Sequence, residues 1–305
     1  MIVVTAGSAF LDIDSFAGCI AYAELTKLQG NEAVAVSSAP LNKSVTPDIR
    51  SKLKLDTYSP QAGDQFVLID VSNAAFFDPI VDQKAIVEVI DHHPGHEQYW
   101  AERLHNKAHI EPIGAACTLV YERYVAEGLT GKMPAVVAEA LAVGILDNTL
   151  NFTAEITSER DKTAYKQLLV IAGKDESLAG TYFSACQDAI EEELEEAIRN
   201  DLKHVTETSL LPEYVGQLVI WNAKALLERE LDRIVAIMNA LSTDWCVNLV
   251  SIVDGKSYII AGSSDAKAKM SRLYDLTFTG AAWAPMPARL RKEILKRAIT
   301  LESQQ

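Results

Sequence analysis

The sequence of 305 residues lacks several features that define whole classes of proteins. It contains only four cysteines, far apart and without a Cys-x-x-Cys pair, which disfavours a structural zinc site and predicts reduced thiols in a cytoplasmic protein. They are Cys19, Cys117, Cys186 and Cys246. Its apolar runs, such as residues 136–146, are too short and too interrupted to cross a bilayer, and residues 1–6 lack the basic start of a signal peptide.

Positive charge is also scarce. The chain has 28 lysines and arginines against 42 acidic residues, which gives a net charge of −14 at pH 7. Such a surface repels phosphate, and this excludes binding of a nucleic-acid duplex through a general basic face. A small anionic substrate stays compatible with this charge, provided that metal ions or a few lysines and arginines reverse the field locally.

The first half of the chain alternates short apolar runs with amphipathic segments. Its predicted strands are almost continuously apolar, as in a parallel sheet covered on both faces. They are residues 2–6, 33–38, 66–71 and 85–91. The predicted helices are residues 15–30, 117–128, 134–146 and 159–173. This alternation predicts an α/β domain, residues 1–180, built on a doubly wound parallel sheet.

A different pattern follows in the second half of the chain. It begins with one predicted charged helix over residues 188–205, followed by a strand, a helix, a hairpin and a basic helix. The hairpin signal is strong, because Asp254-Gly255 stands between two apolar runs. The other segments are residues 217–222, 225–242, 246–253, 257–264 and 287–299. We predict a smaller α+β domain over residues 186–305.

Acidic and histidine side chains gather where elements of the first domain end. They are Asp12 and Asp14 after the first strand, Asp70 after the third, Asp91, His92 and His93 after the fourth (EVIDHHPGHEQYW, 88–100), and Asp147 and Asn148 after the helix 134–146. Each cluster alone is explained by a helix cap or a turn. The carboxyl ends of parallel strands meet at one edge, where ligands bind. Carboxylates held together there repel one another unless a cation neutralises them, so the clusters together predict a Mn²⁺ or Mg²⁺ site.

These blocks, in this order and at these separations, resemble the DHH phosphoesterase superfamily. The resemblance is to the branch of the manganese-dependent (family II) inorganic pyrophosphatases and exopolyphosphatases. The blocks are DIDS (12–15), the strand-end Asp70, DHH (91–93), IGAACTLVYE (113–122) and GILDNTLNFTAEITSERDKTA (144–164), which includes Thr-Ser-Glu-x-Asp. In the second domain, Asp201-Leu202-Lys203 and Arg291-Lys292 match the branch's Asp-x-Lys and Arg-Lys pairs. The Gly-Gly-His segment of the other large DHH branch does not occur.

The resemblance implies a role for each of these residues. The metal ligands would be Asp12, Asp14, Asp70 and His92, with Asp70 bridging two ions. His93 would hydrogen-bond or protonate the substrate phosphate, and Asp91 would orient a metal-binding imidazole. Lys203, Arg291 and Lys292 would grip the phosphates, which places the active site in the cleft between the two domains. On spacing alone, Lys203 is a solvated helix residue and the basic helix complements its own dipole.

Two positions depart from the pattern of the family. The pyrophosphatases have a metal-binding histidine where this chain has Ser8, and an aspartate directly before the threonine where it has Asn148. Three alternatives stay open: Asn148 binds metal through its carbonyl oxygen, Asp147 turns inward to replace the carboxylate, or the second metal is lost. We therefore expect one or two ions.

The resemblance implies hydrolysis of phosphoric anhydrides, either inorganic pyrophosphate or short polyphosphate, by a metal-activated water. Mn²⁺ is the expected cofactor, with Mg²⁺ or Co²⁺ as alternatives. A second hypothesis is a catalytically weakened or silent relative that binds phosphate compounds. A third is a phosphodiesterase on small phosphoesters, although the chain does not interleave aromatic with basic residues as single-strand binders do. No membrane partner is expected, and an edge strand pairing across a two-fold axis would give a homodimer.

Overall fold

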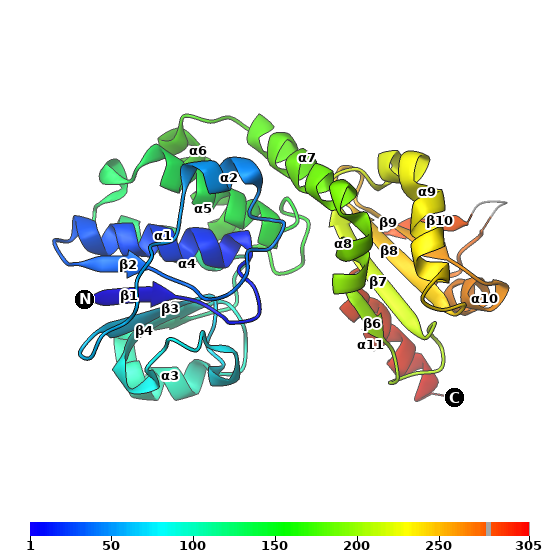
Figure 1. The fold of residues 1–305 in the computed structure, drawn as a ribbon, viewed down its shortest axis with the longest axis horizontal. Coiled ribbons are helices and arrows are strands. Elements are labelled where there is room, and N and C mark those ends of the chain that lie inside the picture. The colour runs from blue at the N-terminus through cyan, green and yellow to red at the C-terminus, as the bar shows by residue number, and fades with distance from the viewer. Residues whose placement is uncertain (279–281, 305) are drawn as a thin grey trace. The chain divides into compact units, whose positions relative to one another are not determined.

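The computed structural model describes residues 1–278 and 282–304, with the side chain of residue 292 outside the described part. The chain divides into two compact units, Met1–Tyr182 and Phe183–Gln305 (Figure 1). Among the described residues, no helix is both long enough and apolar enough to cross a membrane.

The first unit contains a parallel five-stranded sheet in the order β2-β1-β3-β4-β5. Its strands are β1 (Ile2–Thr5), β2 (Ala33–Ala35), β3 (Gln65–Ile69), β4 (Ile86–Asp91) and β5 (Ala108–Ile110). Its helices are α1 (Ile13–Leu28), α2 (Pro47–Lys52), α3 (Glu97–Leu104), α4 (Ala116–Ala126), α5 (Ala135–Asn148), α6 (Glu159–Ala172) and α7 (Ser177–Glu192), which crosses into the second unit. Short 3-10 helices are η1 (Ala74–Phe76), η2 (Gln83–Ala85), η3 (His105–Lys107) and η4 (Thr130–Lys132).

Helices cover both faces of this sheet, which confirms the predicted doubly wound α/β fold (Figure 1). On one face, Trp100 of α3 packs against Val3, Leu68 and Val89. On the other face α1 packs against the sheet and also against α5, and α5 in turn packs against α6. A helix enclosed on several sides needs apolar residues all round, which is why α1 and α5 lack a polar stripe.

The strand order places a topological switch between β1 and β3, because β2 lies on one side of β1 and β3–β5 lie on the other. Connections leaving the carboxyl ends of β1 and β3 diverge there and leave room for a ligand. The predicted strand 66–71 ends earlier than expected, at Ile69, because Asp70 takes a left-handed backbone conformation with φ of 60°. Residues 108–110 were not predicted as a strand; three residues are too short to show a period.

The second unit contains a mixed sheet in the order β10-β9-β8-β7-β6, in which only β7 and β8 are parallel. Its strands are β6 (Leu202–His204), β7 (Tyr214–Ile220), β8 (Trp245–Ser251), β9 (Lys256–Ala261) and β10 (Trp283–Pro287). Its helices are α8 (Leu194–Asn200), α9 (Ala223–Asn239), α10 (Ser264–Tyr274) and α11 (Arg291–Glu302). The predicted hairpin is present, as β8 and β9 pair antiparallel and Gly255 has φ of 63°.

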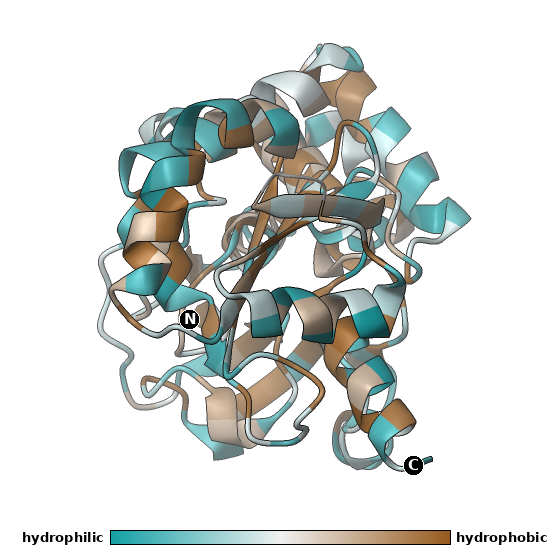
Figure 2. Cartoon of the chain, turned by 90° about the vertical axis from the view of Figure 1, so that its right-hand side faces the viewer, coloured by the Kyte–Doolittle hydropathy of each residue, from teal (hydrophilic) through white to brown (hydrophobic). Residues whose placement is uncertain are grey.

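Successive residues of β8 face opposite sides of this sheet, as the period of two requires. Val247 packs with Leu226 of α9 on one side, whereas Cys246 packs with Met270 of α10 and Ile294 of α11 on the other. Along the helices in Figure 2, hydrophobic and hydrophilic residues alternate, as expected for helices with one face on a core.

The predicted single helix over residues 188–205 is wrong. Glu193 is non-helical and separates α7 from α8, α8 ends at Asn200, and the chain then enters β6. The unpaired edge of β7 offers Leu202 and Lys203 a ladder opposite Gly216 and Val215, and this pairing outweighs their local helix propensity. The basic helix begins at Arg291, later than predicted, because residues 283–287 form edge strand β10.

Close packing of α5 against α4 and α1 makes Gly144 a testable position. An added Cβ would lie 2.6 Å from Cys117 Sγ and 3.3 Å from Asp14 Cα, so the Gly144→Ala variant overpacks the core. Overpacking costs ~1–3 kcal/mol, which exceeds the gain of about 1 kcal/mol in helix propensity. We expect a lower urea midpoint by far-UV circular dichroism, with exposed Gly131→Ala as the control. Wild-type stability of Gly144→Ala would contradict the packing.

Candidate metal centre

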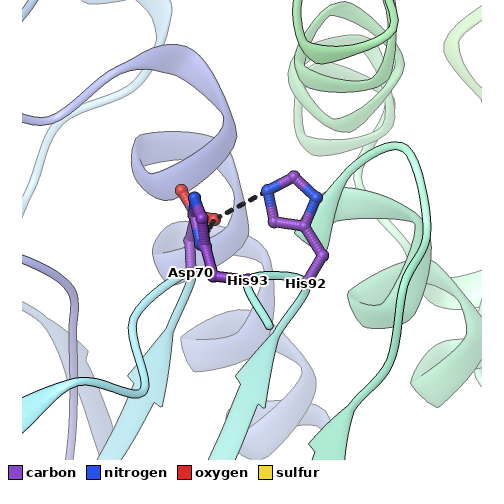
Figure 3. A group of neighbouring side chains, drawn as sticks. All are labelled: Asp70, His92 and His93. Atoms are coloured by element: carbon purple, nitrogen blue, oxygen red, sulfur yellow. Dashed lines mark ion pairs between the residues drawn. The ribbon is translucent and has the colours of Figure 1, made fainter. Parts of the chain in front are cut away.

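Three side chains from separate sequence blocks meet at the carboxyl ends of β3 and β4. Figure 3 shows Asp70, His92 and His93 close together above the strand ends. One potential ligand atom from each lies within 4.8 Å of the other two. His92 Nε2 lies 3.3 Å from Asp70 Oδ1, and His93 Nδ1 lies 3.6 Å from the same oxygen.

Asp70 occupies the middle of this cluster. Its left-handed backbone still donates a hydrogen bond from its N–H to the Ile90 carbonyl at 2.8 Å, which fixes the residue at the strand end. Oδ2 accepts from Ser15 Oγ at 2.7 Å, whereas the buried Oδ1 has no hydrogen-bond partner among the described residues. Oδ1 is balanced only by the neighbouring imidazoles when they are protonated, and a bound cation could take the place of a proton there.

His92 is held by a backbone carbonyl. Its Nδ1 donates to the Ile113 carbonyl at 2.9 Å, so its Nε2 faces Asp70. Burial opposes a charge on His92, but the close contact with Asp70 and the charges of Asp70 and Asp14 outweigh it and raise its pKa to about 10. The ring therefore sits where positive charge is favoured, and a metal ion at Nε2 would replace the proton.

Asp91 organises the turn that carries both imidazoles. Its Oδ1 accepts from the backbone N–H groups of His92 and His93 at 2.7 and 3.1 Å, and it lies 2.8 Å from His93 Nδ1. The hydrogen bond to Asp91 raises the pKa of His93. Asp91 thus contacts the backbone of both histidines and engages the His93 nitrogen that lies near Asp70. The His93 side chain is 62% exposed, which leaves Nε2 open to a substrate.

Asp12 and Asp14 lie at the start of α1. Asp12 caps this helix through Ser15 N–H, and burial together with the charges of Asp70 and Asp14 raises its pKa to about 8. Asp14 is fully buried, and burial followed by the charge of Asp70 raises its pKa to about 7. Its Oδ2 lies 3.9 Å from His92 Nε2. These carboxylates repel one another in a site of low dielectric, and a divalent cation would relieve the repulsion.

Asp147 and Asn148 end α5. Tyr182 Oη donates to Asp147 Oδ1 at 2.8 Å and also lies 3.1 Å from the Ser44 carbonyl oxygen. Burial raises the pKa of Asp147 to about 6, and the charge of Asp147 contributes to the raised pKa of Asp12, so Asp147 belongs to the same acidic cluster. Asn148 Nδ2 is buried without a hydrogen-bond partner among the described residues.

Ser8, Lys203 and Arg291 each contact another residue of their own unit. Ser8 is half-buried in the segment after β1, where its N–H bonds to the Phe76 carbonyl at 2.9 Å. Within the second unit, Lys203 on β6 pairs with Glu207 at 2.7 Å, and Arg291 pairs with Asp201 at 2.5 Å. The side chain of Lys292, a predicted phosphate ligand, lies outside the described part of the chain.

Three contacts of the cluster carry no sequence signal. Ile113 offers only its carbonyl, Ser15 lies 55 positions from the carboxylate that it contacts, and Tyr182 lies 35 positions from Asp147. The donor set itself, carboxylate and imidazole without thiolate, suits Mn²⁺ or Mg²⁺. Together with the close approach of Asp70 Oδ1 to both imidazoles, this chemistry fits a divalent cation.

A carboxylate–histidine cluster lies at the carboxyl edge of a doubly wound parallel sheet, and a separate mixed-sheet unit follows along the chain. This combination is typical of α/β proteins that bind ligands at the edge of a sheet. Residues 2–145 match the model of the DHH family, N-terminal domain. Asp91, His92 and His93 are its DHH triplet.

Known proteins resemble the chain over most of its length. It is 26% identical over 261 residues to a protein of Exiguobacterium sp. named probable manganese-dependent inorganic pyrophosphatase, covering 84% of this chain and 82% of that protein. A Methanococcus jannaschii structure assigned to the family II inorganic pyrophosphatases shares the fold with a TM-score of 0.60 at 17% identity, covering 98% of this chain and all of that one. An exopolyphosphatase-related protein from Bacteroides fragilis has a TM-score of 0.54 at 14% identity, covering 99% and 92%.

Removing the charge of Asp70 tests the metal centre directly. The Asp70→Asn variant keeps the shape of the side chain but removes its negative charge, so we expect Mn²⁺ affinity to fall by more than ~10–100-fold, the loss seen when only groups behind the ligands are altered. Titration calorimetry with Mn²⁺ measures it. Asp78→Asn is the matched control, because Asp78 is also an aspartate of the first unit with little exposure, but it bonds to Ser37 and Ser38. Unchanged affinity in Asp70→Asn would rule out the centre.

Proposed function

We propose that this protein is a divalent-metal-dependent phosphohydrolase that cleaves phosphoric anhydrides, with inorganic pyrophosphate or short polyphosphate as substrate and Mn²⁺ as the metal. The observation that carries the proposal is the convergence of Asp70, His92 and His93, whose potential ligand atoms lie within 4.8 Å of one another, with Asp70 Oδ1 3.3 Å from His92 Nε2. The names of its relatives support the choice of substrate and metal. The four buried cysteines are compatible with action in the cytoplasm.

The metal would be held by the carboxylates of Asp12, Asp14 and Asp70 and by His92 Nε2. When bound, a divalent ion would activate a water and neutralise phosphate charge. The chain supplies the preorganisation for this chemistry. The Ile113 carbonyl fixes the direction of His92, and Ser15 binds only Oδ2 of Asp70, which leaves Oδ1 directed at the site. Neither side chain therefore needs to reorient when the ion binds.

His93 is proposed to act on the substrate phosphate. Asp91 engages Nδ1 at 2.8 Å and favours the protonated ring, which leaves an N–H at Nε2 on the exposed side. This N–H would hydrogen-bond a phosphate oxygen and stabilise the charge that develops on the departing group. Asp91 would then control catalysis by keeping the donor nitrogen of His93 pointed outward.

Asp147 is proposed as the carboxylate that compensates for Asn148. It lies close enough to Asp12 to raise its pKa, and the Tyr182 hydroxyl holds it in place. Asn148 as a ligand and a centre with one ion are the alternatives. Lys203, Arg291 and Lys292 are proposed to bind phosphate oxygens. Phosphate would have to displace Glu207 from Lys203, a partly exposed pair that exchanges at little cost. It would also have to compete with Asp201 for Arg291, whose contacts with Asp201 are part-buried.

A catalytically silent phosphate-binding protein is the second candidate, and the positions Ser8 and Asn148 favour it. A hydroxyl and an amide are weaker ligands for a divalent ion than the imidazole and carboxylate of the family pattern. Under this hypothesis the protein would bind one ion and a phosphate compound without turnover.

Release of orthophosphate decides between these two functions. With Mn²⁺ and pyrophosphate or tripolyphosphate, we expect the purified protein to release phosphate in multiple turnovers. Asp70→Asn, which removes the central carboxylate, is expected to abolish the release. The measurement is a colorimetric phosphate assay, repeated with Mg²⁺ and Co²⁺. No release with any of the three metals, from a protein that still binds Mn²⁺, would leave the silent function standing.

Restoring the family ligands tests why activity would be low. In the variant Ser8→His with Asn148→Asp, two strong ligands return, and we expect tighter Mn²⁺ binding and faster phosphate release than in wild type. The matched control is Ser8→Gln with Asn151→Asp, which adds bulk at one site and a charge three residues from the other. Equal rates in the variant and in wild type would show that the departures do not limit turnover.

A further inference from the structure

We infer that the buried carboxylate of Asp161, on a helix that supplies none of the proposed metal ligands, is a positioning residue for His92 and Asp14. This inference rests on the proposed metal centre and deepens it. Asp161 acts through residues 113–117, which lie between β5 and the first turn of α4 and include the first two residues of that helix. This segment contacts both ligands.

The segment provides three contacts to the ligands. The Ile113 carbonyl accepts from His92 Nδ1 at 2.9 Å. The N–H groups of Ala116 and Cys117 donate to Asp14 Oδ2 and Oδ1, each at 2.8 Å. These are the first two residues of α4, whose N–H groups have no partner within the helix. If this segment shifted, His92 and Asp14 would lose their orientation together.

Asp161 fixes this segment at two points. Its Oδ2 accepts from Gly114 N–H at 3.1 Å, and its Oδ1 accepts from Thr118 Oγ1 at 2.6 Å. Gly114 directly follows Ile113, and Thr118 directly follows Cys117, so the two anchors bracket the groups that hold the ligands. Asp161 and Thr118 are completely buried, and water cannot replace either hydrogen bond.

The approach of the carboxylate requires glycine at position 114. A Cβ there would lie 2.7 Å from Asp161 Oδ2 and 2.6 Å from Thr149 Cγ2. Thr149 follows Asn148, so the segment also packs against the end of α5, where Asp147 and Asn148 lie. The glycine in IGAACT and the aspartate in TSERD are thereby explained as the two halves of one contact.

A second set of bonds ties Asp161 to its own helix. Ser158 caps α6, and its N–H and Oγ both donate to Asp161 Oδ2 at 2.8 Å. The same carboxylate therefore stabilises α6 on one side and positions the ligand-holding segment on the other. This division supplies a matched control, since Ser158→Ala removes a contact of Asp161 without touching residues 113–118.

The experiment measures Mn²⁺ affinity by titration calorimetry, and hydrogen exchange of the Ala116 and Cys117 amides in the metal-free protein. Thr118→Val removes one anchor at constant shape, and Asp161→Ala removes both. We expect each to weaken Mn²⁺ binding by about 10–100-fold, as for other groups that orient ligands, and to lose protection of the two amides. Asp161→Asn is expected to stay near wild type, because its oxygen can accept from Gly114 while its amide donates to the Thr118 hydroxyl.

The control separates positioning from general stability. Ser158→Ala is expected to lower the melting temperature through the lost helix cap but to keep Mn²⁺ affinity and amide protection. The inference is overturned if Thr118→Val keeps both properties, or if Ser158→Ala loses affinity as much as Thr118→Val does. If wild type fails to hydrolyse pyrophosphate, the proposed function falls, whereas amide exchange in the metal-free protein still reports on the Asp161 anchor.

Discussion

The first unit depends on one constraint, the need to keep several carboxylates together in a poorly solvated place. Burial and mutual repulsion raise the pKa values of Asp12 and Asp14 to about 8 and 7, which measures how strongly the fold disfavours their charges. Part of the repulsion is offset by His92 and by two N–H groups at the start of α4. Asp70 Oδ1 has no hydrogen-bond partner among the described residues and lies 3.3 Å from His92 Nε2, so a cation bound there would take the place of a proton and relieve the repulsion that remains.

Much of this arrangement could be predicted because it follows from the sheet. Asp70 and Asp91 stand at or beside the ends of adjacent parallel strands, and the loop after β1 leads to Asp12 and Asp14. Short apolar runs reveal the strands, and the carboxyl ends of parallel strands meet at one edge whatever the details of packing. The class of fold and the gathering of these residues can therefore be predicted from local patterns in the sequence.

The supporting contacts could not be predicted, because each joins distant segments through groups that carry no pattern. Any residue has the carbonyl that Ile113 offers to His92, and the hydroxyl of Tyr182 looks like that of any tyrosine in a helix. The position of Lys203 on a strand could not be predicted for a related reason. Its neighbours favour a helix, but the edge of β7 supplies backbone partners that only the folded unit provides.

The departure at Asn148 shows how such supporting contacts change the meaning of a motif. Consecutive residues of a helix point about 100° apart, so an acid moved by one position cannot simply occupy the old place. Asp147 nevertheless acts on Asp12, and its other contact is Tyr182, the last residue of the first unit, on the helix that continues into the second. Under the proposal that Asp147 compensates for Asn148, the acid is displaced in sequence while its charge stays in the centre, and a hydroxyl from another helix, rather than the motif, fixes its direction. A match to the family pattern at position 148 alone would misjudge the charge of this site.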